Sequence, residues 1–370
     1  MTIILNAVGD VAPDREDPGE CFALARAALR NADIGFCQLE CNLTTRGTRM
    51  PQARHTHRST VAAAVAMREA GFNVVSFAGN HCLDWGPVGL SDTIENLRNS
   101  GLDVVGVGGD ITAARIPVIR EVKGVRTAFL AYSSILPEAY WADAGRAGCA
   151  PLRAHTLYEQ IEPDQPGTPA RIHTWTDRGD LAAMAADIAA ARQHAHVVVV
   201  SLHWGIHFVP AVLADYQREA ARAAIDAGAD IILGHHAHIL KGVEFYRGKP
   251  IFYSLCNFAV DLRMTPEHAN GKGFREIQAL SPDWVPDFDI LYNFPPDSRM
   301  TGVVRASLNR DGVCALAFLP AYINDNAQAE VLKASDTRFR KVVEYLKWCC
   351  EEQAFDTQFK IEVDSLLLSA

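Results

Sequence analysis

Residues 197–203 begin with four valines and end in a histidine: Val197-Val198-Val199-Val200-Ser201-Leu202-His203. Four consecutive valines favour an extended strand because β-branched side chains pack well on a pleated surface. The run has no polar alternation, which is typical of a strand that is covered on both faces. It therefore predicts a central strand over 197–202 in an α/β protein, with His203 directly after that strand.

Short apolar runs alternate with helical patterns on both sides of this strand, as in a sheet with helices on its faces. Further strands are predicted at 3–8, 34–39, 74–78, 104–107, 127–132 and 231–233. Helices are predicted at 21–30, 61–70, 88–100, 180–193 and 216–227. After Gly242 the pattern changes to strands without intervening helices, at 249–254, 302–308 and 313–319. These late strands predict a second, largely antiparallel sheet, which completes a two-sheet sandwich with helices outside.

Two stretches, 134–175 and 261–299, are rich in Pro, Gly, Trp and Tyr and are longer than ordinary connections. We interpret them as insertions that form a rim or lid. Their aromatic residues are expected mainly to pack within the insertions, although stacking on a substrate is the alternative: Tyr140, Trp141, Trp175, Trp284 and Tyr292. The expected organisation is one domain over 1–320, with a helical C-terminal extension over 321–370 packed on it.

Charge and cysteine usage exclude several classes of protein. The chain has 370 residues, with 35 basic against 44 acidic side chains and a net charge of −9, which argues against a nucleic-acid-binding protein. Nine scattered cysteines without a CxxC spacing predict reduced, packed thiols. The first apolar run, Ile3 to Val8, is too short for a signal peptide or a membrane span, so a cytoplasmic protein without membrane association is expected. The sequence makes no prediction of oligomeric state.

Polar residues follow the predicted strands at the point where each strand ends: Asp10, Glu40, Asn80, His81, His203, His236 and His238. The carboxyl edge of an open α/β sheet is where ligand sites form, so these side chains are expected to converge. In an extended His-x-His, both imidazoles lie on one side, so His235 is expected to point elsewhere. Carboxylate, amide and imidazole groups are ligands of Mn²⁺, Zn²⁺ and Fe. One or two divalent ions are therefore expected, and a site without metal stays open.

The ordered motifs resemble those of the CapA family. They are Gly9-Asp10-Val11, Leu39-Glu40-x-Asn42-Leu43-Thr44, Gly79-Asn80-His81-x-x-Asp84-Trp85-Gly86, His203-Trp204-Gly205, Gly234-x-His236-x-His238 and Ile251-Phe252-Tyr253-Ser254-Leu255-x-Asn257-Phe258. That family is named for poly-γ-glutamate capsule proteins and is similar in fold to calcineurin-like metallophosphoesterases. The resemblance implies a four-layer αββα sandwich, here with the two inserted segments.

The resemblance also implies roles for single residues. Glu40 resembles a bridging carboxylate, with Asn80, His203 and His236 completing one metal site and Asp10 and His238 contributing to the other. His81, held by Asp84, resembles the group that protonates a leaving atom or stabilises developing charge, and metal-activated water would be the nucleophile. The expected catalytic residues are thus His81, Asp84, Asp10 and His236.

Candidate substrate contacts are His57, Arg58, Trp204 and His207. In the segment Ala53-Arg54-His55-Thr56-His57-Arg58, an extended chain would present both histidines on one side, beside arginines that suit a carboxylate or phosphate. A solvated polar loop is the alternative interpretation of this segment.

Three departures from the family pattern bear on the chemistry. Asp10-Val11-Ala12 lacks the histidine of the usual Asp-x-His, His207 stands where an acidic residue is common, and Cys256 stands where a glycine is common. One metal site is therefore expected to be short of a ligand.

Three hypotheses follow from the motifs and their departures. The leading one is a metal-dependent hydrolase that cleaves an amide or ester bond of a small acidic or peptide-like substrate. The second is a metal-independent peptide Cα epimerase that uses Asp10 and a histidine as its two bases, since metal-free peptide epimerases resemble this family. The third is a non-catalytic binding or polymer-assembly protein.

Overall fold

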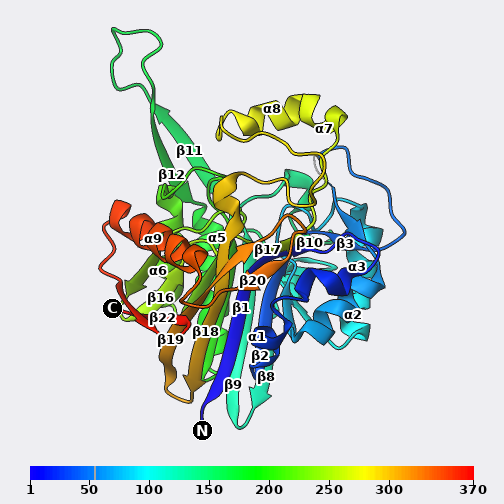
Figure 1. The fold of residues 1–370 in the computed structure, drawn as a ribbon, viewed down its shortest axis with the longest axis vertical. Helices are drawn as coiled ribbons and strands as arrows, with labels where there is room; N and C mark the ends of the chain where they lie inside the picture. The colour runs from blue at the N-terminus through cyan, green and yellow to red at the C-terminus, as the bar shows by residue number, and fades with distance from the viewer. Residues whose placement is uncertain (54–55) are drawn as a thin grey trace.

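The computed structural model describes residues 1–53 and 56–370. Two mixed β-sheets pack face to face, and helices cover their outer faces (Figure 1). The four-layer αββα sandwich that the sequence predicts is therefore confirmed.

The first sheet has the order β21-β22-β19-β18-β1-β2-β5-β6, with β17 beside β1 and β20 beside β19. Its strands are β1 (Ile3–Ala12), β2 (Ile34–Leu39), β5 (Val74–Ser76), β6 (Asp103–Val105), β17 (Asn257–Val260), β18 (Met300–Asn309), β19 (Gly312–Ile323), β20 (Ala329–Val331), β21 (Gln358–Glu362) and β22 (Ser365–Ser369). From β1 to β6 neighbouring strands are parallel, whereas from β1 through β18 to β21 they are antiparallel.

The second sheet has the order β15-β16-β14-β13-β9-β8. Its strands are β8 (Val118–Val122), β9 (Val125–Ser133), β13 (Val197–His203), β14 (Ile231–His235), β15 (Val243–Tyr246) and β16 (Lys249–Phe252). The four central strands are parallel and the two edge strands are antiparallel to their neighbours. The valine run forms β13, with a strand on each side, as predicted.

Alternate residues of the central strands enter different layers because strand side chains alternate between the two faces of a sheet. Val197 and Val199 lie in the core between the sheets, whereas Val198 and Val200 lie in the core beneath the helices. The two sheets meet where Phe36 of β2 stacks on Phe129 of β9, with ring centroids 5.8 Å apart. This two-sided burial explains why the run carries no polar alternation.

Helices α2 (Val61–Ala70) and α3 (Gly86–Asn99) pack beside the parallel half of the first sheet, and α5 (Arg178–Arg192) and α6 (Asp215–Asp226) cover the second sheet. Helix α2 has the predicted bounds because Thr60 caps its first turn and Gly71, with φ of 116°, ends it in the left-handed conformation. The single helix predicted over 21–30 is instead a 3₁₀ turn, η1 (Pro18–Phe22), followed by α1 (Arg26–Arg30).

The prediction of a separate antiparallel sheet made of late strands is wrong. Strand β18 pairs with the free edge of β1 and so extends the first sheet, whereas β15 and β16 extend the second. Three helices also follow Gly242: α7 (Pro266–Asn270), α8 (Lys272–Gln278) and α9 (Thr337–Glu352). The sequence pattern of a strand does not indicate which sheet edge it pairs with, and both sheets have an edge at which a further strand can pair.

The two insertions and the C-terminal segment contribute no strand to the parallel parts of the two sheets. The first insertion includes η2 (Glu138–Tyr140), β10 (Gly148–Cys149) and a projecting hairpin of β11 (Ala154–Glu159) and β12 (Arg171–Thr176) (Figure 1). The second carries α7 and α8 and ends in η3 (Pro296–Arg299). Residues 321–370 contain α9 and also the β21–β22 hairpin, which pairs with β19, so the segment is not helical throughout.

Short elements complete the chain: β3 (Asn42–Leu43), β4 (Arg58–Ser59), β7 (Val107–Gly108) and α4 (Ile111–Ala114). All nine cysteines are free thiols, and all except Cys314 are buried, as the sequence predicts. Within the described ranges, no helix has both the length and the apolar character that crossing a bilayer requires.

Candidate metal centre

Three strands of the two sheets bring Asp10, Glu40 and His203 together. Asp10 lies near the end of β1, Glu40 follows β2, and His203 ends β13. Each of these buried residues offers a ligand atom within 4.8 Å of the others. Oε1 of Glu40 is 3.3 Å from Nδ1 of His203. The sandwich therefore brings together candidate metal-ligand atoms from three strand ends that are far apart in sequence.

Three imidazoles form a second group beside the first. His207, His236 and His238 also offer ligand atoms within 4.8 Å of one another. The ring centroids of His236 and His207 are 3.9 Å apart, and those of His236 and His203 are 4.8 Å apart. The sequence assigned His207 to substrate and paired His236 with His203, whereas the geometry gathers His207 with His236 and His238.

Several buried polar atoms at this site have no hydrogen-bond partner, as do others elsewhere in the described structure. Oε1 of Glu40, Nδ1 of His203 and Nδ1 of His236 all lack a hydrogen-bonding partner in the described structure. Such orphaned atoms are rare in folded proteins and require an explanation. A divalent cation supplies one because it accepts lone pairs from a carboxylate and from neutral imidazoles at the same time.

The electrostatics of these groups agree with that fit. Burial, and secondarily the charge of Asp10, raises the pKa of Glu40 well above its usual value. Burial, with neighbouring imidazoles, lowers the pKa values of His203 and His236 well below the usual value, so both rings are neutral and able to act as ligands. His81 and Gln38 favour a charge on Glu40 but offset only part of the effect of burial, and a bound cation would offset more of it.

His235 lies in the site, so the prediction that it points elsewhere is wrong. Its Nδ1 is 3.0 Å from Oδ1 of Asp10, and the backbone N–H of His236 donates to Oδ2 of Asp10 at 3.1 Å. Strand β14 ends at His235, and His236 and His238 have φ of 84° and 55°. The alternation of strand side chains therefore does not apply to this segment. The histidine missing from Asp10-Val11-Ala12 was the signal that Asp10 needs another imidazole.

His81 is oriented by a hydrogen-bonded chain. Its Nδ1 is 2.7 Å from Oδ2 of Asp84, and the hydroxyl of Tyr140 donates to Oδ1 of Asp84 at 3.0 Å. Burial lowers the pKa of His81, but the charge of Asp84, with smaller contributions from Glu40 and Asp10, raises it to about 9. Nε2 of His81 is 3.9 Å from Oε2 of Glu40, so the ring lies between its own carboxylate and the candidate ligands.

Two amide side chains complete the polar site. Oδ1 of Asn80 is 2.7 Å from Nε2 of His203. Oδ1 of Asn257 is 2.7 Å from Nδ1 of His238, and the amide of Asn257 donates to the hydroxyl of Tyr292 at 2.9 Å. Asn257 belongs to the last quoted motif but had no predicted role, and its contact with His238 shows that it orients that ring.

A cavity of about 930 Å³ opens above these residues. Its polar wall contains seven predicted residues: Glu40, His57, Asn80, His81, Asp84, His207 and His238. Asp10, His203 and His236 lie beneath the cavity and do not line it. Residues 134–137 of the first insertion and several apolar residues of the second complete the wall, so both insertions contribute to the rim as predicted.

Two predicted substrate contacts lie elsewhere. Trp204 is fully buried, donates from Nε1 to the carbonyl of Tyr253 and stacks on that ring, so it packs the core of the second sheet. The Arg58 guanidinium lies 3.9 Å from the ring centroid of Trp85 and does not line the cavity. Arg54 and His55 of the same segment lie outside the described residues.

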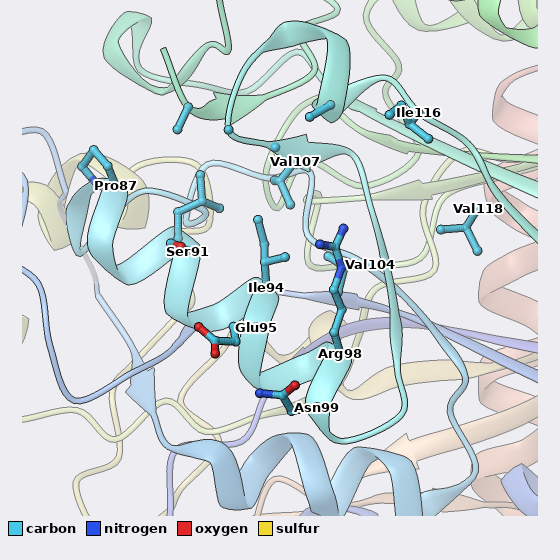
Figure 2. Close-up of a pocket in the computed structure, with 15 residues that line it drawn as sticks. Pro87, Ser91, Ile94, Glu95, Arg98, Asn99, Val104, Val107, Ile116 and Val118 are labelled. Carbon is cyan, nitrogen blue, oxygen red and sulfur yellow. The ribbon is translucent and has the colours of Figure 1, made fainter. Parts of the chain in front are cut away.

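A separate hollow of about 460 Å³ lies between α3 and the strand segments around Val104 and Val107 (Figure 2). Its labelled polar side chains are Ser91, Glu95, Arg98 and Asn99, all from α3. None of the predicted site residues lines it. The predicted site residues therefore do not extend into this second hollow.

Comparisons with known proteins agree on the family. The model of the family described as bacterial capsule synthesis protein PGA_cap matches residues 4–262, which include every predicted site residue. The chain is 33% identical over 261 residues to the PGA biosynthesis protein CapA of Bacillus subtilis, covering 70% of this chain and 61% of that protein. It is 32% identical over 246 residues to a probable polyglutamine synthesis accessory protein of Mycobacterium tuberculosis, covering 64% and 58%. The chain thus spans about three fifths of the length of these relatives.

Two solved structures show a remote likeness. A hypothetical protein from Thermus thermophilus gives a TM-score of 0.46 at 14% identity, over 86% of this chain and 98% of that one. A calcineurin-like phosphoesterase from Bacillus subtilis gives 0.43 at 12% identity, over 95% and 97%. TM-scores this low support no conclusion about the present site. The family match is sufficient by itself: the chain belongs to the bacterial capsule synthesis protein family PGA_cap.

Proposed function

We propose that the protein is a metal-dependent hydrolase that cleaves an amide or ester bond in a small acidic or peptide-like substrate. The supporting observation is the set of orphaned, buried ligand atoms of Glu40, His203 and His236 beneath a cavity large enough for a small peptide. A divalent ion held there by these residues, with Asp10, Asn80, His207 and His238, would activate water and polarise the carbonyl.

His81 is proposed as the proton donor to the leaving atom. It lines the cavity, and the charge of Asp84 raises the pKa of its ring, which favours the protonated form. Asp84 fixes the ring through Nδ1, which leaves Nε2 directed toward Glu40 and the candidate ligands. Tyr140 holds Asp84 in turn. Asn257 orients His238 in the same way on the other side of the site.

The position of Asp10 favours hydrolysis over metal-free epimerisation. A two-base epimerase needs both bases in contact with the substrate α-carbon. Asp10 is fully buried, lies beneath the cavity, and has both carboxylate oxygens engaged by His235 and the backbone of His236. Such a carboxylate is suited to hold a ligand or a metal and not to exchange a substrate proton.

A single experiment separates these functions. The protein, purified without chelator and then loaded with Mn²⁺ or Zn²⁺, is incubated in D₂O with a library of short peptides and peptide amides, and the products are analysed by mass spectrometry and chiral chromatography. We expect cleavage by addition of water, which is lost after chelation and restored by metal. Deuterium uptake at Cα without cleavage, retained after chelation, would instead establish epimerisation. Metal loading without turnover of any library member would leave a binding or assembly protein.

A further inference from the structure

The cavity has an apolar side that the proposed chemistry does not use. Four aromatic residues form it, and we call them the aromatic wall: Phe208, Phe274, Trp284 and Phe294. The ring of Trp284 lies 5.4 Å from Phe208 and 4.8 Å from Phe274, centroid to centroid. The wall starts at the candidate ligands, because the His238 ring is 5.2 Å from Phe294 and 5.6 Å from Phe208.

Aliphatic side chains extend this wall. Leu262, Met264 and Ile277 of the second insertion line the same cavity, and Ile135 and Leu136 of the first insertion also line it. Phe208, Met264, Phe274 and Trp284 belong to a separate hydrophobic cluster of the structure, distinct from the two sheet cores. The insertions therefore build an apolar surface that begins directly at the imidazole group.

The charges around the cavity do not suit an acidic side chain. Among the described residues that line it, no lysine or arginine occurs, whereas Glu40 and Asp84 are carboxylates. Arg58, predicted to receive such a group, lies over Trp85 outside the wall. The other basic side chains in the wall are imidazoles, and His81 is already paired with Asp84. A substrate carboxylate in this half of the cavity would lose hydration without gaining a strong basic partner.

We propose that the group next to the reacting bond is an apolar side chain of aromatic size, carried by a peptide-like substrate and seated on the aromatic wall. This inference rests on the proposed function for the identity of the reacting bond, but the apolar subsite itself does not require metal. The family match ends at residue 262, so Met264, Phe274, Ile277, Trp284 and Phe294 lie beyond it. The ligand residues lie within the matched region, and most of the proposed specificity surface does not.

Binding by the chelated protein tests the subsite without catalysis. The probes are two matched peptides, N-acetyl-Gly-Phe-amide and N-acetyl-Gly-Glu-amide, measured by saturation-transfer NMR and isothermal titration. Because burying an aromatic side chain is favourable and burying a carboxylate is not, we expect the Phe peptide to bind at least about tenfold more tightly. The metal-loaded protein is expected to cleave peptides with the same preference.

Ile277→Lys places a cation on the apolar side of the cavity, from helix α8. Ile277 is partly exposed, so the lysine retains access to solvent. We expect this variant to lose the preference for the Phe peptide and to bind the Glu peptide better than the wild type does. Leu280→Lys is the matched control, since Leu280 follows the same helix, is 47% exposed and does not line the cavity. Ile277→Gln, which is polar without charge, should weaken the Phe peptide alone and checks that an altered preference is not misfolding.

The outcomes separate the subsite from the reaction. Tighter binding of the Glu peptide by the wild type, no measurable binding of the Phe peptide, or an unchanged preference in folded Ile277→Lys would overturn the apolar subsite. Binding of the Phe peptide without cleavage of any substrate by the metal-loaded protein would instead overturn the hydrolase and leave the subsite standing.

Discussion

Neutralising Glu40 should affect the protein with metal and the protein without metal in different ways. In the Glu40→Gln variant the side chain keeps its shape but loses its charge. Without metal, Oε1 of Glu40 has no hydrogen-bond partner, and burial together with Asp10 disfavours its charged form. The substitution also removes the attraction between Glu40 and His81, but burial is the larger effect and disfavours the charge. We therefore expect the variant without metal to be at least as stable as the wild type.

The expected loss appears only when metal is present. A metal concentration of about 100 Kd stabilises the folded state by about 2.7 kcal/mol. The unfolding entropy of 370 residues, at roughly 2.1 cal/mol/K per residue, is about 0.8 kcal/mol/K, so the wild-type Tm should rise by about 3 °C. If the variant binds about 100-fold more weakly, the same concentration contributes only about 0.4 kcal/mol, and the shift falls below about 1 °C.

Glu244→Gln provides the matched control in the same assay, which is calorimetry of each variant with chelator and with Zn²⁺ or Mn²⁺. Glu244 is also buried, but Arg222 and the hydroxyl of Tyr253 both donate to it, away from the cavity. Breaking these charge-assisted contacts should lower the free energy of unfolding by about 1–3 kcal/mol, and so lower Tm both with and without metal, while preserving the metal shift. A full metal shift in Glu40→Gln, or a destabilisation of its metal-free form equal to that of Glu244→Gln, would refute the assignment of Glu40.

Other variants test the remaining parts of the site. Asp84→Asn removes the charge that orients His81. It should lower kcat by roughly 10²-fold or more with little change in KM, measured on any substrate found for the enzyme. An unchanged kcat would contradict the role of His81 as proton donor. Lys241 is buried, donates to two carbonyls of the 205–214 loop, and has a pKa that burial lowers to about 8. The pKa of this lysine is higher in the unfolded chain, so the unfolded chain binds more protons between pH 8 and 10.5. Lys241 therefore makes the free energy of unfolding rise with pH in that window. Lys241→Met should lack this rise in denaturant titrations from pH 7.5 to 9. Burial raises the pKa of Cys350 to about 11, so from about pH 9 the unfolded chain loses a proton that the folded chain keeps, and stability should fall as pH increases further. A free energy of unfolding that is constant from pH 9 to 10.5, in the wild type and in Lys241→Met, would contradict both linkages.

The strands of the core were predictable because their burial leaves a direct mark on the sequence. β13 and β2 begin at the predicted residues, since runs such as Val197 to Val200 are covered on both faces. Sheet membership was not predictable for the late strands. The pattern of a strand indicates which of its faces are buried but not which strand it pairs with. β18 pairs with β1, which lies nearly 300 residues earlier in the chain.

Some residues of the candidate site could likewise be predicted from the sequence, and others could not. The carboxyl ends of strands identified Asp10, Glu40 and His203, because chain topology alone brings such ends to one edge. His235 was missed because the prediction extended strand geometry past the end of β14, where the positive φ of His236 and His238 turns the rings independently of alternation. The role of Asn257 was missed because its partner His238 is reached only after that turn.

Chemistry and specificity in this protein come from different parts of the chain. The candidate ligands are fixed by strand ends and by the loops directly after β13 and β14, which the sheets hold rigidly. The aromatic wall comes mainly from the second insertion, whose Met264, Phe274 and Trp284 pack in a small cluster with Phe208, Ala237 and Ile239. Substitutions in the insertion should therefore change which substrate binds while leaving the metal-dependent rise in Tm intact. Substitutions of the ligands should do the reverse. If Ile277→Lys abolished the metal shift as well as the substrate preference, the two parts would be coupled, and the insertion would have to be counted as part of the metal centre.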